Sequence, residues 1–159
     1  MFKGKFRILI LLALSVIFIL AACGEEKKEV DYSTLNKENV TIAVNQSSWE
    51  SRQKIKEIEV ENNVVNLNLE TTLDSTEEFD ALRTFIVGDL ESLQNFKDIQ
   101  MLNVKFSTIT KDKYGKAKQT HVLTGKIKGA DLRKINFDNF HESDLQGVMS
   151  FSYVNPVIK

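Results

Sequence analysis

The hydrophobic residues between positions 39 and 69 alternate with polar ones. In NVTIAVN, at 39–45, the alternating residues Val40, Ile42 and Val44 predict a short strand. Further on, two alternating runs flank the pair Asn62-Asn63, and asparagine tolerates the left-handed backbone that a tight turn needs. We therefore expect a β-hairpin, whose inward residues are Ile58, Val60, Val65, Leu67 and Leu69.

A helical period replaces the alternation after residue 75. Ser75 and Glu78 have the spacing of a capping box, in which both side chains satisfy exposed backbone N–H groups. Hydrophobic residues then recur every three or four positions, which predicts a helix from about 76 to 95 with one apolar face. That face consists of Phe79, Leu82, Phe85, Ile86, Leu90, Leu93 and Phe96.

Alternation returns in the last third of the chain. Leu102, Val104 and Phe106 predict a strand, residues 111–116 a turn and residues 117–128 the returning strand. A short helix is expected around 130–135, and VMSFSYV at 148–154 predicts a final strand with Met149, Phe151 and Tyr153 on its inner side. Together these elements predict a single α+β domain at 39–159, with a mainly antiparallel sheet packed on one long helix and a short second helix.

The first 22 residues have a different composition. Lys3, Lys5 and Arg7 precede an apolar run from 8 to 20 that only Ser15 interrupts. In a helix this run would span roughly 20 Å, short of the ~30 Å hydrocarbon core of a bilayer. Its length and its flanks therefore favour a cleaved export signal over a permanent transmembrane helix.

The end of the run, Leu20-Ala21-Ala22-Cys23 followed by Gly24, resembles the lipobox of bacterial lipoproteins. The resemblance covers only the first 24 residues, and the alternative is an ordinary signal or anchor with an incidental cysteine. It implies cleavage between Ala22 and Cys23 and a diacylglyceryl group on the Cys23 thiol. It also implies an anchor in the cell membrane that leaves the domain on the extracytoplasmic face.

The lipid would account for the only cysteine in the chain, so no intrachain disulfide is expected. Two acyl chains hold a protein on a membrane stably, whereas one does so only marginally. Residues 23–38, the lipidated end and the polar stretch after it, are expected to form a flexible tether. The composition of the whole chain, with abundant lysine, asparagine and isoleucine and one proline, is compatible with a low-GC Gram-positive source.

Charge is distributed unevenly along the domain. Residues 50–98 contain 12 acidic and 5 basic side chains, whereas residues 99–134 contain 2 acidic and 9 basic ones. If Leu102, Leu123 and Ile127 point inward, strand alternation sends Val122 and several lysines outward. This predicts one cationic surface for an anionic partner (lipid headgroups, a wall polymer or an acidic protein), formed by Lys105, Lys111, Lys113, Lys116, Lys118, Lys126 and Lys128.

The alternative for these lysines is a solvated sheet face that discourages edge-to-edge pairing. A nucleic-acid partner is not expected, because the chain without its signal is acidic, with 18 Lys and Arg against 22 Asp and Glu. No aromatic stacking platform accompanies the lysines either.

Few residues indicate catalysis. His121 is predicted to point inward beside Leu123, and His141 lies near the metal-capable Asp138, Glu142 and Asp144 in a spacing that matches no zinc or calcium loop. No serine occupies a nucleophile elbow, and no glycine-rich loop that could hold a phosphate is present. No catalytic residue, metal or cofactor is therefore assigned.

Two aromatic residues remain as candidates. Tyr153 is expected in the core, whereas Trp49 lies in a polar stretch and could either bind a ligand or pack at the entry to the domain. The sequence as a whole favours a membrane-tethered, non-catalytic domain that binds a protein or an anionic envelope polymer. The alternatives are a small enzyme acting on envelope material and a lipoprotein that captures a solute.

Overall fold

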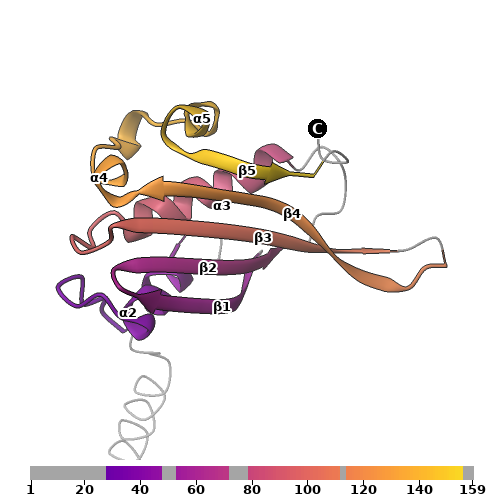
Figure 1. Cartoon of the computed structure of the whole chain (residues 1–159), viewed down its shortest axis with the longest axis horizontal. Helices are drawn as coiled ribbons and strands as arrows, with labels where there is room; N and C mark the ends of the chain where they lie inside the picture. The colour runs from indigo at the N-terminus through magenta and orange to yellow at the C-terminus, as the bar shows by residue number, and fades with distance from the viewer. Residues whose placement is uncertain (1–27, 48–52, 72–78, 112–113, 156–159) are drawn as a thin grey trace, which may run out of the picture.

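The computed structural model describes residues 28–47, 53–71, 79–111 and 114–155. Five strands lie side by side in one sheet, with α3 behind them in Figure 1, so the predicted α+β class is confirmed. In chain order the elements are α2 (Lys37–Asn45), β1 (Gln53–Glu61), β2 (Val64–Thr71), α3 (Phe79–Leu93), β3 (Met101–Lys111), β4 (Ala117–Lys128), α4 (Gly129–Leu132), the 3-10 helices η2 (Phe137–Asn139) and η3 (Glu142–Asp144), α5 (Leu145–Val148) and β5 (Ser150–Val154).

The strand order is β1-β2-β3-β4-β5, so each strand neighbours the next one along the chain. The pairs β1-β2, β3-β4 and β4-β5 are antiparallel, whereas β2 and β3 run parallel. The sheet is therefore mixed, and the prediction of a mainly antiparallel sheet is wrong. The reason is that α3 follows β2 and precedes β3 in the chain. It returns the chain to the end of the sheet at which β2 began, so β3 can run parallel to β2.

The predicted first hairpin is confirmed. Glu61 pairs with Val64, which leaves Asn62 and Asn63 as a two-residue loop. Both asparagines have positive φ, 50° and 63° respectively, the backbone that the tightest hairpin turns require. Ile58 and the inward residues of β2 are buried as predicted, and Val60 is half-buried.

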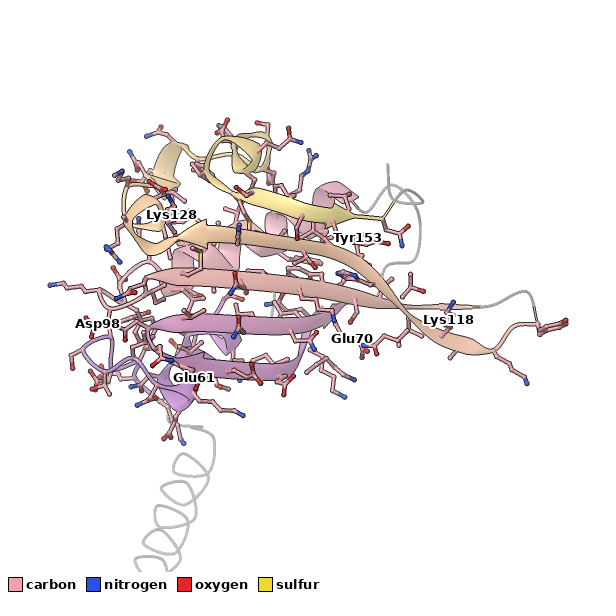
Figure 2. The ribbon with its side chains drawn as sticks, viewed as in Figure 1. Glu61, Glu70, Asp98, Lys118, Lys128 and Tyr153 are labelled. Atoms are coloured by element: carbon pink, nitrogen blue, oxygen red, sulfur yellow. The ribbon has the colours of Figure 1, made fainter. Side chains whose placement is uncertain are left out.

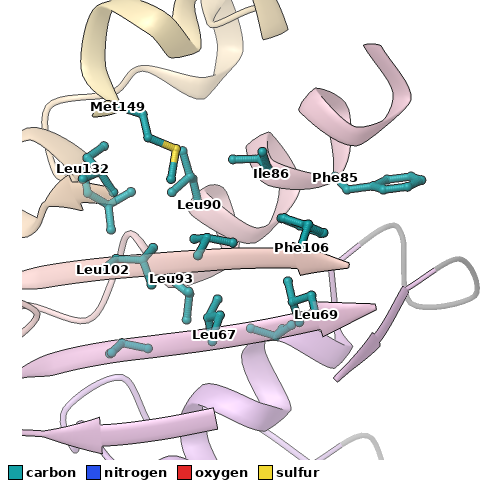
Figure 3. Packing of buried hydrophobic residues seen from close by; sticks show 14 of the residues in the cluster. Leu67, Leu69, Phe85, Ile86, Leu90, Leu93, Leu102, Phe106, Leu132 and Met149 are labelled. Carbon is teal, nitrogen blue, oxygen red and sulfur yellow. The ribbon is translucent and has the colours of Figure 1, made fainter. Parts of the chain in front are cut away.

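The core lies between the sheet and α3, as Figure 3 shows from close by. The apolar face predicted for this helix is buried at Leu82, Phe85, Ile86, Leu90 and Leu93. Leu67, Leu69, Leu102 and Phe106 meet it from β2 and β3. The predicted capping box at 75–78 lies outside the described residues.

The prediction of one long helix is wrong, because α2 packs beside α3. It forms where a strand was expected at 40–44. The Asn36 side chain accepts a hydrogen bond of 2.9 Å from the Asn39 backbone N–H and so caps the new helix. The buried residues of α2 are Val40, Ala43 and Val44, a helical spacing that coexists in the sequence with the alternation of Val40, Ile42 and Val44.

Part of the segment expected to be a tether lies against the core. Val30, Tyr32 and Leu35 are half-buried there, and the ring centroids of Tyr32 and Phe96 are 5.0 Å apart. The Gln46 side chain also donates a hydrogen bond of 2.6 Å to the Lys28 carbonyl oxygen. The packed part of the chain therefore includes residues that precede position 39.

Two β-bulges decide which face several side chains occupy. Phe106 pairs with Leu123 but Ser107 pairs with His121, so Val122 is an extra residue on β4. Likewise Thr124 pairs with Tyr153 and Gly125 with Phe151, which makes Ser152 an extra residue on β5. An extra residue reverses the in-and-out alternation beyond it, so predictions from simple alternation are inverted on the far side of each bulge.

The C-terminal third adds short helices at one side of the sheet (Figure 1). The short helix expected around 130–135 forms at Gly129–Leu132. Leu132, Leu145 and Met149 from this region are buried in the same core. Within the described residues, no helix is both long enough and apolar enough to cross a membrane.

Candidate functional site

The face of the sheet opposite α3 is rich in polar side chains, and we call it the outer face. Its glutamates and lysines are exposed, and its asparagines are half-buried. Register and alternation place the following residues on it: Glu57, Glu59 and Glu61 from β1, Asn66 and Asn68 from β2, Asn103 and Lys105 from β3, and Thr124, Lys126 and Lys128 from β4.

Charge is ordered across this face. The side chains form rows perpendicular to the strands, each with an acid on β1 and a lysine on β3 or β4. Asparagines lie between the charges in two of these rows, whereas Val64 and Met101 lie between Glu61 and Lys128. Glu61 and Lys128, both labelled in Figure 2, mark the acidic and the basic side at one end of the sheet. Two further rows are Glu59, Asn66, Asn103 and Lys126, and Glu57, Asn68, Lys105 and Thr124.

A shallow groove of about 260 Å³ lies in the middle of the outer face. Its polar lining comes from Glu57, Glu59, Asn66, Asn68, Asn103, Lys105 and Thr124. Leu67 and Val104 also line it, although their side chains are buried, so the main chain of β2 and β3 forms part of its floor. We refer to this feature as the outer-face groove.

The charged groups of the groove are not neutralised within the described part of the chain. Neither Glu57 nor Glu59 forms an ion pair with Lys105 or with any other residue described there. Two of the asparagines between these charges are linked to each other, because Asn103 Nδ2 donates a hydrogen bond of 2.8 Å to Asn66 Oδ1. The groove therefore offers separated charges of both signs with amide groups between them.

The predicted cationic surface is not one surface. Lys105, Lys126 and Lys128 are exposed on the outer face. Lys118 is on the opposite face, because it pairs with Thr110, which lies two residues after the buried Thr108 and so on the same side of β3. The cause is the bulge at Val122, which was predicted to point outward and is instead buried. The acidic residues of β1 share the face as well, which the sequence did not predict because nothing in it places the first hairpin beside β3.

The remaining lysines of that prediction lie towards the turn between β3 and β4. Lys116 is exposed there. Lys111 is the last residue of β3, and its side chain is not described. Lys113 lies outside the described residues, as does Trp49.

His121 and Tyr153 form a pair on the outer face, so the predictions that both point into the core are wrong. Their rings are stacked, with centroids 4.4 Å apart and planes 15° apart, and Tyr153 is 39% exposed. The Nε2 atom of His121 lies 2.7 Å from Thr124 Oγ1 and 3.2 Å from the Leu123 carbonyl oxygen. The bulges at Val122 and Ser152 turn these two residues outward.

The polar segment around His141 forms a turn. The His141 backbone N–H donates a hydrogen bond of 3.0 Å to Asp144 Oδ2, which caps η3. Glu142 Oε1 accepts a hydrogen bond of 3.0 Å from Thr84 Oγ1, and its own backbone N–H and Thr84 lower the pKa of the Glu142 carboxyl. Among the described residues, no group of three or more His, Cys, Asp or Glu side chains is arranged to hold a metal ion.

Among the described acids, Asp89 on α3 has the pKa that departs most from its ordinary value, and the sequence did not single it out. It is fully buried, and this burial raises the pKa of its carboxyl to about 7. Its Oδ1 accepts a hydrogen bond of 2.7 Å from Gln53 Nε2, whereas Oδ2 has no partner among the described residues. The nearby Ser47 hydroxyl acts to lower the pKa of Asp89, although it meets no hydrogen-bond criterion with any described residue.

A signal for Asp89 was present in the sequence, because it lies three residues after Ile86 and four before Leu93, within the apolar stripe of the helix. Its partner Gln53 pairs with the buried Thr71 and so lies on the inner side of the sheet, away from the outer-face groove. We interpret Asp89 as a structural group.

Comparison of the chain with protein families, curated proteins and solved structures gave no match.

Proposed function

We propose that this protein is a lipoprotein anchored to the extracytoplasmic face of the cell membrane through lipid on Cys23, and that its non-catalytic domain binds a protein or an envelope polymer through the outer face. The anchor is inferred from the lipobox resemblance and from the basic and apolar residues before it. The observation that supports binding is the outer-face groove, whose charges form no ion pair with any residue that the structure describes. Exposed charged groups of this kind are suited to contacts with another molecule.

The arrangement of charge bears on the kind of partner. Glu57, Glu59 and Glu61 occupy the same face as Lys105, Lys126 and Lys128. A polyanion lying across this face would approach the glutamates and be repelled, because like charges across an interface are unfavourable. A partner that carries both signs of charge fits better, so of the two predicted partner classes the outer face favours a protein.

The enzyme alternative requires a histidine that works with an acid in a pocket. In the described residues, His121 contacts Thr124 and Tyr153, and His141 caps a short helix beside Asp144. Neither histidine lines the outer-face groove. We therefore retain the non-catalytic binding function as the proposal.

A released form of the protein tests both halves of the proposal. Cys23→Ser removes the thiol that would be lipidated, so we expect this variant in the soluble fraction while the wild type sediments with membranes. The soluble variant is then mixed with envelope preparations from cells that lack the protein. Adding Asn68→Arg, which fills the groove with a large cation, should weaken the affinity for these preparations about tenfold, equivalent to about 1.4 kcal/mol.

Glu91→Arg is the matched control, because it places the same arginine side chain at an exposed position of α3, on the other side of the sheet. Equal loss of binding from both variants would contradict the outer face as the binding surface. Membrane sedimentation of the Cys23→Ser variant would contradict the anchor.

A further inference from the structure

We propose that the outer-face groove binds a short zwitterionic peptide, with its ammonium group at Glu57 and Glu59 and its carboxylate at Lys105. This inference rests on the proposed function, in which the outer face is the binding surface, and it names the chemical class of the ligand. Three properties of the groove support it: the order of its charges, their spacing and the amide groups between them.

The charges are separated by a defined number of strands. Glu57 and Lys105 lie in one row on β1 and β3, and Glu59 and Lys126 lie in the next row on β1 and β4. At about 4.8 Å per strand, the acid and the lysine are about 10 Å apart in the first row and about 14 Å apart in the second. An extended peptide rises about 3.3–3.6 Å per residue, so this separation matches a chain of about three or four residues.

The middle of the groove suits peptide groups. An asparagine side chain is itself an amide, with an oxygen that accepts and a nitrogen that donates two hydrogen bonds. The bond from Asn103 Nδ2 to Asn66 Oδ1 leaves the Asn66 nitrogen and the Asn103 oxygen for other partners. Asn68 stands between Glu57 and Lys105 in its row and supplies a further donor and acceptor. A ligand whose two charged ends are joined by amide bonds satisfies all of these groups.

The same lining disfavours other small ligands. An anion without a positive end gains contact with Lys105 but is repelled by Glu57 and Glu59, which line the same groove. An apolar ligand finds little apolar surface, because the Leu67 and Val104 side chains are buried on the other face of the sheet. The charge-assisted hydrogen bonds at the two ends are the strongest contacts available here, and they require the free ammonium and the free carboxylate.

Titration calorimetry of the mature lipidated protein in detergent tests this inference with four tetra-alanine probes. One probe has both ends free, the second is N-acetylated, the third is C-amidated and the fourth is blocked at both ends. We expect the free peptide to bind most tightly and each single block to weaken binding about tenfold, which is the loss expected for one charge-assisted hydrogen bond.

Variants assign each end of the peptide to its residue. In the double variant Glu57→Gln and Glu59→Gln, free and N-acetylated peptides should bind equally, while amidation still weakens binding. In Lys105→Met, free and amidated peptides should bind equally, while acetylation still weakens binding. This pattern is a pairwise coupling that a general loss of stability would not produce. Glu91→Gln and Lys97→Met, at exposed positions, are the matched controls and should behave like the wild type.

The inference is overturned if the four probes bind equally, if none binds, or if the blocked peptide binds most tightly. Reversed assignments, in which Lys105→Met removes the effect of acetylation, would also overturn it. These failures differ from failure of the proposed function. A protein that binds no peptide, but whose binding to envelope preparations still depends on Asn68→Arg and not on Glu91→Arg, keeps its proposed binding surface and loses only this ligand.

Discussion

At the scale of single residues, Asp89 is a carboxyl group enclosed in the core next to Gln53 and Ser47. Gln53 donates to one of its oxygens. In the part of the chain that the structure describes, the other oxygen has no hydrogen-bond partner, and neither do the Ser47 hydroxyl and the Gln53 side-chain oxygen. A neutral carboxylic acid has an O–H that could donate to such an acceptor, whereas an ionised carboxylate cannot. The protonated form therefore fits this site better.

This predicts how stability depends on pH. The pKa of Asp89 is about 7 in the folded protein against an ordinary value of 3.8, so between these values the folded state binds more protons than the unfolded state. The stabilising contribution of Asp89 is complete below about pH 4 and is lost as the pH rises to about 7, by an amount on the order of 4 kcal/mol. Asp89→Asn should remove this part of the pH dependence.

Urea unfolding at several pH values measures the effect. The free energy of unfolding of Asp89→Asn, minus that of the wild type, should increase between pH 4 and pH 7 and then level off. Glu91→Gln, also on α3 but exposed, should run parallel to the wild type. A constant difference between Asp89→Asn and the wild type across this range would show that Asp89 does not titrate as described.

At the scale of elements, the start of α4 is fixed against the loop before β3. The Gly129 backbone N–H donates a hydrogen bond of 2.9 Å to the Gln100 carbonyl oxygen, and Arg133 Nη1 donates bonds of 3.0 Å to the Lys97 and Ile99 carbonyl oxygens. A Cβ atom added at Gly129 would overlap the Ile99 carbonyl oxygen. The close approach of the two backbones therefore requires glycine.

We expect Gly129→Ala to lower the free energy of unfolding by about 3 kcal/mol, because backbone on both sides must shift to relieve the overlap. Gly147→Ala in α5 is the control, since a Cβ there meets nothing within 4 Å. It should leave stability unchanged or raise it by roughly 0.5 kcal/mol. Thermal unfolding followed by circular dichroism compares the two variants. Equal melting temperatures would contradict the close contact.

The elements also show where sequence reasoning succeeds. The apolar stripe of α3, the Asn62-Asn63 turn and the pairing of residues 117–128 with β3 follow from local patterns, and the structure has them. The reversed faces of His121 and Tyr153 do not follow, because one extra residue at a bulge inverts alternation and nothing in the neighbouring letters marks Val122 or Ser152 as that residue. α2 was missed because its apolar residues fit both a strand and a helix, although Asn36 was available as a cap.

At the scale of the whole molecule, the sequence predicted the α+β class but neither the mixed sheet nor the candidate surface. The candidate surface consists of residues that are distant in the chain. Glu57 and Glu59 on β1 lie across the sheet from the lysines because β2 pairs with β1 on one side and, in parallel, with β3 on the other. A charge count along the sequence found an acidic and a basic half. It could not show that the two halves meet on one face.

The central claim is that the outer face, and not the helical side, contacts a partner at the cell surface. Photo-crosslinking on intact cells tests it most directly, with a benzoylphenylalanine placed at Asn68 or Lys126 on the outer face, or at Glu91 on α3 as the control. The account predicts a discrete crosslinked product from both outer-face positions and none from Glu91. Crosslinks from Glu91 alone, or equal crosslinks from all three positions, would contradict it.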